Sequence, residues 1–530
     1  MPEIEVPVLI AGGSLVGLST ALLLARHGVR ALAVEHHRGT AIHPRAAQMC
    51  QRAIEILRSV GLEQIALEKS EEQFVQDGAV MAVETLAGKE LAWYVPNLNE
   101  GIRDVSPTVR VFLTQNLLEP LMKARAEELG AELRFGTELV SFEQDSSGVT
   151  AVIRNRDSGK TSTVRARYLV ACDGSHSLIR QALGIRMLGH GVLSNAITIY
   201  FRGEVGPLLR GRNLSVIYVY NSDLTGFFRI EKPFNTGFLA VNSVGPRERP
   251  VTDVWTGLSD DRCQELLRAS LGVDHIPIAI ENVMKWQAEA DTAERFDGGR
   301  VFLAGDSAHV MPPTGGFGGN TGVQDAHNLA WKVAMVLQGK AGPGLLATYD
   351  AERRPIGAFT VEQAYSRYVT RWAPYLGTEG VHPIAPDLDI DLGYRYRSAA
   401  VIPDGTDDGR LLEPTRETKG RPGTRAPHLA VRRNGKSIST LDLFAGNFTL
   451  VTGSDSGEWS RAAQRAARAA GIEFDVHAIA EPEFPEAYGI APSGAVLVRP
   501  DGFVAWRAKD GEAASAEMVS RVLKTVLGRT

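Results

Sequence analysis

Cysteine is scarce in this sequence: its 530 residues include only Cys50, Cys172 and Cys263, which stand far apart. No Cys-x-x-Cys pair or Cys/His cluster occurs, so the sequence excludes a disulfide framework and predicts no metal site. Residues 426–530 contain no cysteine at all, which excludes thiol redox chemistry there. So few thiols are typical of proteins from a reducing cytoplasm, which is where we expect this chain.

Long apolar runs and an excess charge of either sign are also absent. No stretch of about 18 apolar residues occurs, so we expect no transmembrane helix. Glu3 and Glu5 stand where a signal peptide would carry positive charge. The formal net charge is −5, which gives no reason to expect binding to nucleic acid or anionic lipid. We therefore expect a soluble intracellular protein without nucleic-acid or membrane partners, present as a monomer or homodimer.

The length of the chain allows about three domains, and the pattern of elements divides it accordingly. Buried strands that alternate with helices predict an α/β nucleotide-binding domain, which is interrupted by consecutive strand-like segments typical of an antiparallel sheet. A stretch rich in Gly, Pro and charge separates these from a last α/β segment. The predicted boundaries are 1–75, 106–187 and 288–399 for the nucleotide-binding domain, 76–105 and 188–287 for the inserted domain, 400–425 for a linker and 426–530 for the last domain.

The stretch AGGSLVGLS, residues 11–19, follows the first predicted strand and opens a helix. Aligned with G-x-G-x-x-G it supplies Gly12 and Gly17, with Ser14 in the second place. The two glycines permit a tight turn and close packing, and the helix N-terminus offers N–H groups to a pyrophosphate. Glu35 ends the next strand, where a carboxylate accepts hydrogen bonds from ribose hydroxyls. By itself the pattern fits either a dinucleotide site or a compact strand-to-helix turn.

Two further motifs follow buried strands. Asp173 opens DGSHSLIR, and it either meets a ligand at the carboxyl end of its strand or caps the helix that follows. Asp306 lies in GDSAHVMPPTGGFGGNTGVQDAHNLAWK, where crowded glycines expose N–H groups suited to an anion or a polarised ring. Because each glycine costs conformational entropy, we predict a functional loop there, followed by a helix that begins at Gly322.

In this order the three motifs resemble those of class A flavoprotein monooxygenases, the aromatic hydroxylases with the p-hydroxybenzoate hydroxylase fold. The strings HPRAAQMCQRAIEILRSVGLE and PPTGGFGGNTGVQDAHNLAWK are most similar to bacterial aromatic polyketide hydroxylases, namely the tetracenomycin, aklavinone and angucyclinone oxygenases. The resemblance covers nearly the whole chain. It implies an α/β fold with an FAD-binding Rossmann-like (GR2) domain, an inserted antiparallel-sheet substrate domain and a C-terminal thioredoxin-like domain.

The resemblance also implies which residues hold FAD. The first loop and its acid bind the adenosine half, Arg45 meets the pyrophosphate, and the Asp-Gly motif of Asp173 lies near both FAD and NAD(P)H. The Gly-Asp motif places Asp306 on the ribityl chain and its glycine loop on the isoalloxazine ring. The implied cofactor-binding residues are Gly12, Ser14, Leu15, Val16, Gly17, Glu35, His36, Arg45, Gln115, Val140, Asp173, Asp306, Pro313, Gly316, Gly318, Gly319 and Asn320.

The implied activity is that of an FAD-dependent aromatic monooxygenase. NADPH or NADH reduces FAD, O₂ forms a flavin C4a-hydroperoxide, and one oxygen atom passes to a polycyclic aromatic polyketide. Six aromatic residues either line the substrate pocket or pack in the core: Trp93, Tyr218, Tyr220, Phe227, Phe238 and Trp286. No catalytic base is assigned. Groups with suitable chemistry to act as a base or to stabilise a phenolate are His43, His190, His309, Arg52, Arg367 and Arg371.

Other functions on the same frame stay open from the sequence. A Baeyer–Villiger oxygenase would share the FAD-binding motifs, whereas a halogenase is disfavoured because W-x-W-x-I-P is absent. A non-catalytic FAD-binding scaffold is the remaining alternative, and the intact glycine loop argues against it.

Overall fold

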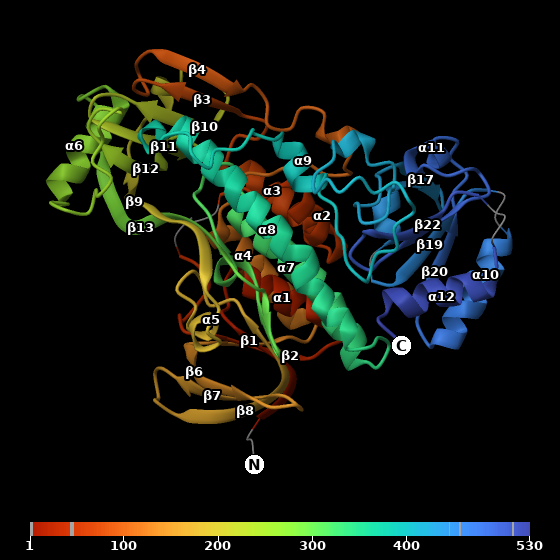
Figure 1. Cartoon of the computed structure of the whole chain (residues 1–530). Coiled ribbons are helices and arrows are strands. Elements are labelled where there is room, and N and C mark those ends of the chain that lie inside the picture. The colour runs from red at the N-terminus through yellow and green to blue at the C-terminus, as the bar shows by residue number, and fades with distance from the viewer. Residues whose placement is uncertain (1–3, 43–46, 445, 455–456, 511–513, 530) are drawn as a thin grey trace.

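The structure, a computed structural model, describes residues 4–42, 47–444, 446–454, 457–510 and 514–529. Two eight-stranded sheets, a four-stranded sheet and a two-stranded ribbon organise the chain (Figure 1). Within the described ranges, no helix combines the length and apolarity that crossing a membrane requires.

The first sheet carries the predicted βαβ pattern. Its strands are β1 (Ile4–Ala11), β2 (Ala31–Glu35), β5 (Glu132–Phe135), β6 (Thr137–Gln144), β7 (Val149–Asn155), β8 (Thr161–Ala171), β14 (Asp297–Gly298) and β15 (Val301–Leu303). Its helices are α1 (Leu15–Arg26), α2 (Gln51–Ser59), α3 (Glu63–Gln73), α4 (Gln115–Glu128), α5 (Leu178–Ala182) and α7 (Gly318–Leu337). The order β15-β8-β1-β2-β5 is parallel throughout, and β6 and β7 form an antiparallel meander with β8.

Parallel strands direct their carboxyl ends to one edge of this sheet, where open α/β folds bind ligands. Strands β1, β2, β8 and β15 are neighbours, so the residues that end or follow them meet at that edge. These residues are Gly12, Glu35, Asp173 and Asp306. The predicted α/β arrangement is confirmed.

The second sheet corresponds to the predicted antiparallel insertion, although one of its strand pairs, that of residues 79–83 with residues 214–219, is parallel. Its strands are β3 (Ala79–Val83), β4 (Glu90–Val95), β9 (Met187–Arg202), β10 (Leu214–Tyr220), β11 (Leu224–Glu231), β12 (Thr236–Val244), β13 (Ala279–Ala293) and β16 (His309–Val310). Side chains alternate along β10: Ile217 and Val219 pack with residues of α6 (Asp260–Leu271) on one face. Tyr218 lies on the other face, among residues from the end of α8 (Gly344–Arg371) and just beyond it.

Helix α8 connects the parts of the molecule. Its 28 residues give a length of about 42 Å, and in Figure 1 it runs diagonally from the second sheet towards the C-terminus. At its amino end, Gly342 N donates to Leu527 O at 2.9 Å, and just past its carboxyl end Trp372 packs on Tyr218. One rigid element therefore contacts the C-terminal segment and the second sheet together.

The C-terminal segment has the strand order of a thioredoxin fold. Its elements are β19 (Phe448–Thr452), α10 (Gly457–Ala470), β20 (Phe474–Ala478), α11 (Phe484–Tyr488), β21 (Ala495–Val498), β22 (Val504–Ala508) and α12 (Ala516–Val526). The sheet order is β20-β19-β21-β22, with β19 parallel to β20 and the other pairs antiparallel. The ribbon of β17 (Ala430–Arg433) and β18 (Lys436–Ser439) precedes it.

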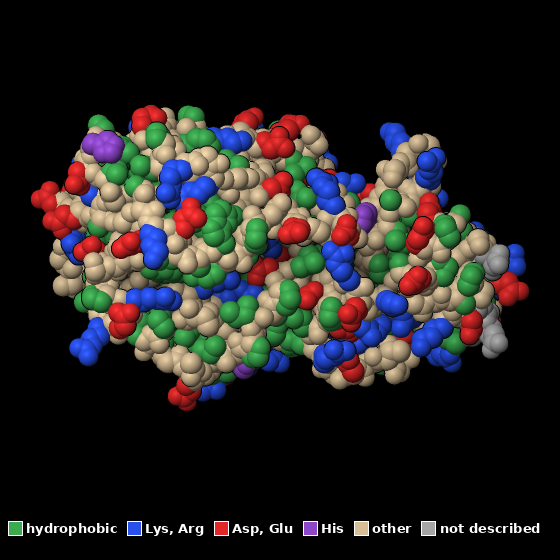
Figure 2. Space-filling view, turned by 90° about the horizontal axis from the view of Figure 1, so that it is seen from above, with side chains coloured by type: hydrophobic (Ala, Val, Ile, Leu, Met, Phe, Trp, Pro, Cys, Tyr) green, Lys and Arg blue, Asp and Glu red, His purple; other side chains and the backbone are tan. Residues whose placement is uncertain are grey.

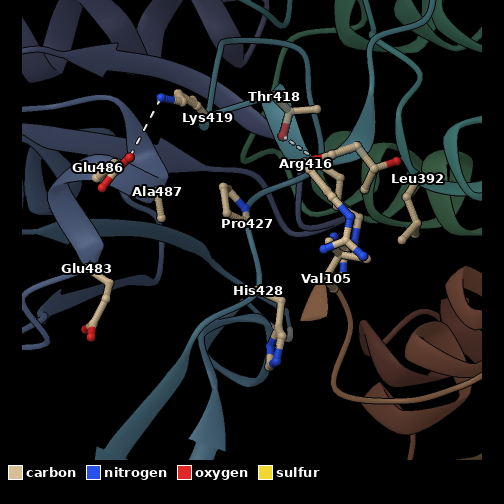
Figure 3. Close-up of a pocket in the computed structure, with 12 residues that line it drawn as sticks. Val105, Leu392, Arg416, Thr418, Lys419, Pro427, His428, Glu483, Glu486 and Ala487 are labelled. Atoms are coloured by element: carbon tan, nitrogen blue, oxygen red, sulfur yellow. Dashed lines mark hydrogen bonds and ion pairs between the residues drawn. The ribbon is translucent and has the colours of Figure 1, made fainter. Parts of the chain in front are cut away.

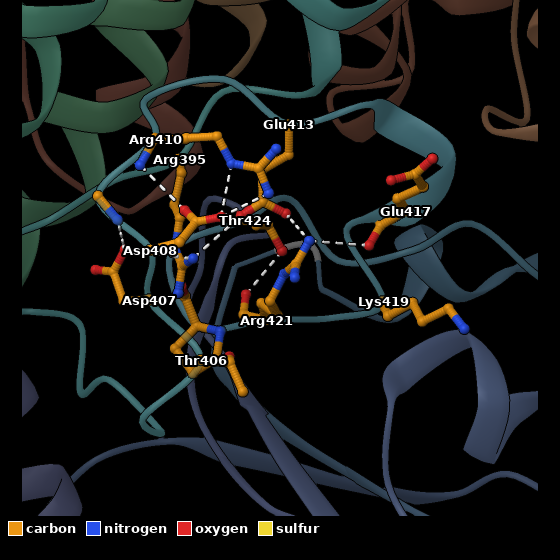
Figure 4. Close-up of polar contacts among 12 residues, drawn as sticks. Arg395, Thr406, Asp407, Asp408, Arg410, Glu413, Glu417, Lys419, Arg421 and Thr424 are labelled. Atoms are coloured by element: carbon orange, nitrogen blue, oxygen red, sulfur yellow. Dashed lines mark hydrogen bonds and ion pairs between the residues drawn. The ribbon is translucent and has the colours of Figure 1, made fainter.

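Residues 400–425, the predicted linker, contain no helix or strand beyond a 3₁₀ turn at Thr415–Glu417 and are nevertheless firmly anchored (Figure 4). Glu413, 1% exposed, accepts a hydrogen bond from Arg395 at 3.0 Å and pairs with Arg421. Arg397 pairs with Asp407 at 2.7 Å. Ion pairs therefore hold this segment against its neighbours and within itself.

The surface matches the even charge balance. On the face seen in Figure 2, Lys and Arg side chains are interspersed with Asp and Glu, and neither sign dominates the view. This face therefore has no extended region of one charge that would attract a large charged partner.

Candidate cofactor and substrate site

The amino end of α1 presents free backbone donors. The first hydrogen bond within the helix joins Leu18 N to Ser14 O at 2.8 Å, so the N–H groups of Leu15, Val16 and Gly17 have no partner within the helix. The side chain of Ser14, at the N-cap position, does not cap the helix. The positive end of the helix dipole is therefore available to an anion such as a pyrophosphate.

Two glycines hold this loop tightly against its neighbours. Gly12 has φ +108°, and a Cβ there would lie 2.1 Å from Cys172 O. A Cβ on Gly17 would lie 2.0 Å from Gly12 O. No side chain fits at either position, and this close packing keeps the loop beside the end of β8, next to Asp173.

Glu35 is fixed beside the same loop. Its carboxylate accepts hydrogen bonds from Gly13 N at 2.7 Å and His37 N at 2.8 Å. Burial alone would raise the pKa of Glu35, but these backbone hydrogen bonds lower it, so the group is ionised at neutral pH. Among the described residues, Glu35, His36 and His37 form the one group with metal-ligating spacing, although the two histidines are exposed.

Ser14 is hydrogen-bonded into the protein itself. Its hydroxyl donates to Glu119 Oε1 at 2.6 Å and accepts from Gln115 Nε2 at 2.7 Å. Ala41 N donates to the other oxygen of Glu119, a fully buried side chain, at 2.6 Å. The sequence analysis missed Glu119, and its only signal is a spacing of four residues from Gln115, which places both on one helix face.

Ser14→Gly should restore the usual glycine and yet weaken FAD binding slightly, because it removes the two hydrogen bonds that hold the loop to Glu119 and Gln115. A hydrogen bond is worth about 1 kcal/mol, and Gln115 still donates to Glu119 at 2.6 Å, so we expect the Kd for FAD to rise by less than about tenfold. Fluorescence titration of the apoprotein with FAD measures this change. Ser19→Ala is the matched control, since within the described part of the chain Ser19 Oγ bonds only to Leu15 O of its own helix, at 2.7 Å. A loss above about 100-fold would show instead that the serine hydroxyl binds the cofactor directly.

The glycine loop contains a second free helix end. Helix α7 begins at Gly318, so the predicted start at Gly322 was wrong by one turn. The first hydrogen bond at this end joins Thr321 N to Phe317 O at 2.8 Å, which leaves the N–H groups of residues 318–320 without a partner in the helix. Glycine favours loops by propensity, but the buried packing of Phe317 against Ala364 fixes the turn as helix.

The residues around this helix end differ in exposure. Pro313 is exposed, and Gly316, Gly318 and Gly319 are half-buried at the surface. The side chain of Asn320 is used internally, because its Oδ1 accepts from Cys50 N at 2.9 Å and its Nδ2 donates to Gly316 O at 2.8 Å. The predictions for Arg45 and His43 lie outside the described residues.

A buried ionic cluster positions the Gly-Asp motif. Asp325 accepts hydrogen bonds from Gly305 N at 3.1 Å and Arg353 Nε at 2.7 Å, and His309 Nε2 lies 2.7 Å from its carboxylate. Burial would raise the pKa of Asp325, but Arg353 and His309 outweigh it and lower the pKa. Asp306, in contrast, is exposed between buried neighbours. The cluster thus fixes the backbone from which Asp306 projects, and the sequence analysis missed Asp325 and Arg353.

The carboxylate of Asp173 caps the helix that follows, which is one of the two roles considered for it. One carboxylate oxygen accepts from Ile179 N at 3.2 Å and caps α5, while the other is buried without a hydrogen-bond partner. Burial raises the pKa of Asp173 above its usual value. Arg180 joins this motif to the Gly-Asp motif by donating to Ser175 O at 2.8 Å and Ser307 O at 3.0 Å.

These pieces meet around Val16. A Cβ on Gly305 would lie 2.7 Å from Val16 Cγ2, and one on Gly322 would lie 2.5 Å from the same atom. The amino ends of α1 and α7 and the Gly-Asp turn therefore pack directly together. Val140, which was also predicted to bind the cofactor, is 48% exposed on β6. This strand begins directly after Gly136, whose N–H donates to His37 O at 2.7 Å, two residues from Glu35.

Most of the predicted pocket aromatics pack together on one face of the second sheet. The ring of Phe227 lies 5.3 Å from that of Trp372 and 5.7 Å from that of Phe238, and Tyr218 lies 5.7 Å from Trp372. The same cluster contains Tyr220 and Trp286. Trp93 lies apart, 48% exposed on β4 at the sheet edge, where its indole donates to Glu90.

The candidate catalytic groups separate by location. His190 lies 3.0 Å from Glu362 and stacks on an α8 tyrosine, whereas His309 is fully buried in the Asp325 cluster. Arg52 donates to the β21–β22 hairpin at 2.7 Å, so it faces the C-terminal domain. Arg367 pairs with Asp387 at 2.6 Å. Of the three arginines, Arg371 is the one that lies beside the aromatic face, with its guanidinium 5.4 Å from the centre of the Tyr94 ring.

A separate cavity of about 280 Å³, which none of these candidate groups lines, lies between the C-terminal domain and the 400–425 segment (Figure 3). Its lining residues are Val105, Leu392, Thr415, Arg416, Thr418, Lys419, Arg425, Pro427, His428, Glu483, Glu486 and Ala487. Each Arg or Lys of this lining already pairs with an acid, for example Arg416 with Asp104 at 3.0 Å and Lys419 with Glu486 at 4.0 Å. The cavity therefore offers no unpaired cation to a ligand.

Comparison with family models gives two matches. Residues 5–364 match the family described as FAD binding domain. Residues 419–530 match the family described as aromatic-ring hydroxylase, C-terminal.

Individual proteins match over almost the whole chain. The 4-methyl-5-nitrocatechol 5-monooxygenase of Burkholderia sp is 50% identical over 98% of each chain. The tetracenomycin A2 monooxygenase-dioxygenase of Streptomyces glaucescens is 37% identical over 99% of this chain and 97% of that protein. The crystal structure of aklavinone-11 hydroxylase with FAD and aklavinone superposes with a TM-score of 0.92 at 35% identity and covers 100% of both chains.

Proposed function

The chain belongs to the FAD-binding aromatic-ring monooxygenases, and on that premise we propose that it consumes NADPH or NADH and O₂ to hydroxylate a phenolic ring. The observation that carries the proposal is the meeting of two helix amino ends, those of α1 and α7, at the carboxyl edge of one parallel sheet. A Cβ on Gly12, Gly17 or Gly322 would collide with the protein itself, so glycine is what allows the two ends to pack so closely together.

The donor set at this edge suits both halves of FAD. We assign the pyrophosphate to the N–H groups of residues 15–17, the adenosine ribose to Glu35 and the ribityl chain to Asp306. The N–H groups of residues 318–320 would face the flavin ring and stabilise negative charge on it. Bound FAD would accept a hydride from the nicotinamide and activate O₂ for transfer of one oxygen atom.

The chain's own residues would orient the substrate and exclude water from it. The aromatic face of the second sheet and the end of α8 provide a mostly apolar wall next to the glycine loop. Exclusion of water protects a reactive oxygen donor from side reactions. One relative named above acts on a nitrocatechol and another on a tetracenomycin, so we propose an aromatic substrate between these limits of size, with a polycyclic polyketide as one class.

Turnover under ¹⁸O₂ with a panel of catechols and polycyclic phenols tests the proposal. We expect NAD(P)H oxidation to accelerate with an accepted substrate, and the product to gain one ¹⁸O atom with its rings intact. A ring-expanded lactone would assign the chain to Baeyer–Villiger chemistry instead. A yellow protein that oxidises no NAD(P)H with any aromatic would support a non-catalytic FAD-binding scaffold.

A further inference from the structure

The turn of the β21–β22 hairpin is buried, although connecting turns usually lie at the surface, where water satisfies their backbone groups. Residues 499–503 form this turn, all five are buried, and Phe503 is 2% exposed. The cofactor domain supplies partners in place of water. Arg52 of α2 donates to Asp501 O at 2.7 Å, and the indole of Trp331 in α7 donates to the Asp501 carboxylate at 3.1 Å. The turn is therefore a contact between the C-terminal domain and two helices of the cofactor domain.

A chain of contacts connects this turn to the amino end of α7 through two buried side chains. The ring of Phe503 lies 4.2 Å from that of Tyr396, whose hydroxyl accepts from Arg353 Nη1 at 3.1 Å. The same guanidinium donates from Nη2 to Thr321 O, in the first turn of α7, at 3.1 Å, and from Nε to Asp325 at 2.7 Å. Since Asp325 holds the Gly-Asp turn, Arg353 fixes both elements assigned to the flavin half of the cofactor, and Tyr396 holds Arg353.

A second set of contacts connects the turn to the same helix end through α2. The guanidinium of Arg52 lies 5.4 Å from the centre of the Phe503 ring. Two residues earlier, at the N-cap of α2, Cys50 N donates to Asn320 Oδ1 in the first turn of α7 at 2.9 Å. Phe503 thus contacts both sets of residues that hold the amino end of α7.

We propose that Phe503 positions the amino end of α7 against the flavin, so that the C-terminal domain tunes the reduction potential of a cofactor bound by another domain. The N–H groups of residues 318–320, assigned above to the flavin ring, stabilise negative charge only where they are aligned with it, because a hydrogen bond weakens steeply with misalignment. Phe503 and Tyr396 are positioning residues, since they act through Arg353. The inference rests on the proposed FAD site, and it gives a function to a domain that contains no cysteine.

Phe503→Leu in the full-length, FAD-loaded protein tests this positioning. Leucine keeps the position apolar but removes the ring that lies on Tyr396. Displaced donors at α7 would stabilise the reduced, anionic flavin less, so we expect a more negative reduction potential. A tenfold loss of preference for the reduced flavin, the order expected for one misaligned hydrogen bond to a charged group, corresponds to about 30 mV for a two-electron couple. Reduction together with a reference dye, in the absence of substrate, measures the potential.

Two further variants separate positioning from stability. Tyr396→Phe removes the hydroxyl that accepts from Arg353 and keeps the stacked ring, so the preference for reduced flavin should fall by a factor between about two and ten. The control is Phe484→Leu, since Phe484 is a fully buried residue of α11 that packs on Tyr488 at 4.6 Å in a different apolar cluster. The control should lower the free energy of unfolding in urea about as much as Phe503→Leu and leave the potential unchanged.

Each outcome decides for or against the positioning role. An unchanged or more positive potential in Phe503→Leu, or an equal change in Phe484→Leu, would overturn it and leave the assignment of FAD intact. If Phe503→Leu does not fold, the potential of Tyr396→Phe decides alone: a negative shift supports the role and an unchanged value overturns it. If the unmodified chain binds no FAD, the proposed function is overturned as well.

Discussion

Gly17→Ala should give a folded protein that purifies without its yellow cofactor. The added Cβ would lie 2.0 Å from Gly12 O, so the loop must move away from α1. Since the N–H groups of residues 15–17 point at the proposed pyrophosphate only in the present geometry, their displacement weakens binding directly. Overpacking of this kind costs about 1–3 kcal/mol, and with the lost donors we expect the Kd for FAD to rise at least about 100-fold.

The ratio of flavin absorbance to protein absorbance measures occupancy in this variant, and circular dichroism verifies the fold. Gly344→Ala is the matched control, because a Cβ at Gly344 has Gly528 O at 3.9 Å as its nearest neighbour, an ordinary contact. Full flavin occupancy in Gly17→Ala would contradict the assignment of this loop to the cofactor. Comparison with Ser14→Gly then separates two effects on FAD binding. Gly17→Ala changes the space available in the loop, whereas Ser14→Gly mainly removes hydrogen bonds.

Local patterns predicted the elements at the cofactor edge well. The apolar run of β1 and the glycine turn before α1 are fixed by short-range sterics, so they can be recognised without tertiary context. The order of the strands, in contrast, depends on contacts between distant segments. The resemblance implied the fold class without a strand order, and the order β15-β8-β1-β2-β5 comes from the structure.

The parts that the sequence did not predict depend on tertiary contacts. Propensity placed the start of α7 after the glycines, but the burial of Phe317 extends the helix to Gly318. Glu119 looks like an ordinary helix-surface acid until the loop that contains Ser14 packs over it. The residues of 400–425 were predicted as a linker from their Gly, Pro and charge, and their ion pairs with residues outside the segment, such as Arg395, could not be predicted from the segment itself. The predicted domain boundaries stay predictions.

A buried ionic network joins the C-terminal domain to the helices of the cofactor domain. Arg499, in the β21–β22 hairpin, donates to both carboxylate oxygens of Glu352 in α8, at 2.6 and 2.9 Å. Lys332 and Asn328 of α7 donate to the same carboxylate at 2.8 and 2.7 Å. These three charged side chains are all fully buried, and Glu352 and Asp501 together balance the two cations, which come from two parts of the chain.

Glu352→Gln should therefore be the most destabilising single change considered for this chain. It leaves Lys332 and Arg499 buried with too little negative charge, and removal of one partner from a buried pair costs about 3–5 kcal/mol of unfolding free energy. Urea unfolding at pH 7 measures the loss. The control is Glu138→Gln, which breaks a partly exposed pair with Arg154 and should cost at most about 1 kcal/mol. A loss this small in Glu352→Gln would mean that the network contributes little to holding the domains together.

The same variant should flatten the acid side of the stability profile. Burial would raise the pKa of Glu352, but Arg499 and Lys332 outweigh it and hold the pKa well below the ordinary value. An unfolded chain takes up the proton near pH 4.3, so at and below this pH it binds more protons at this position than the folded chain. The contribution of Glu352 is thus fully present above about pH 5 and declines as the pH falls further. Unfolding free energies at pH 7 and pH 4 should differ less in Glu352→Gln than in the unmodified chain, and an equal difference would show that Glu352 does not titrate with folding.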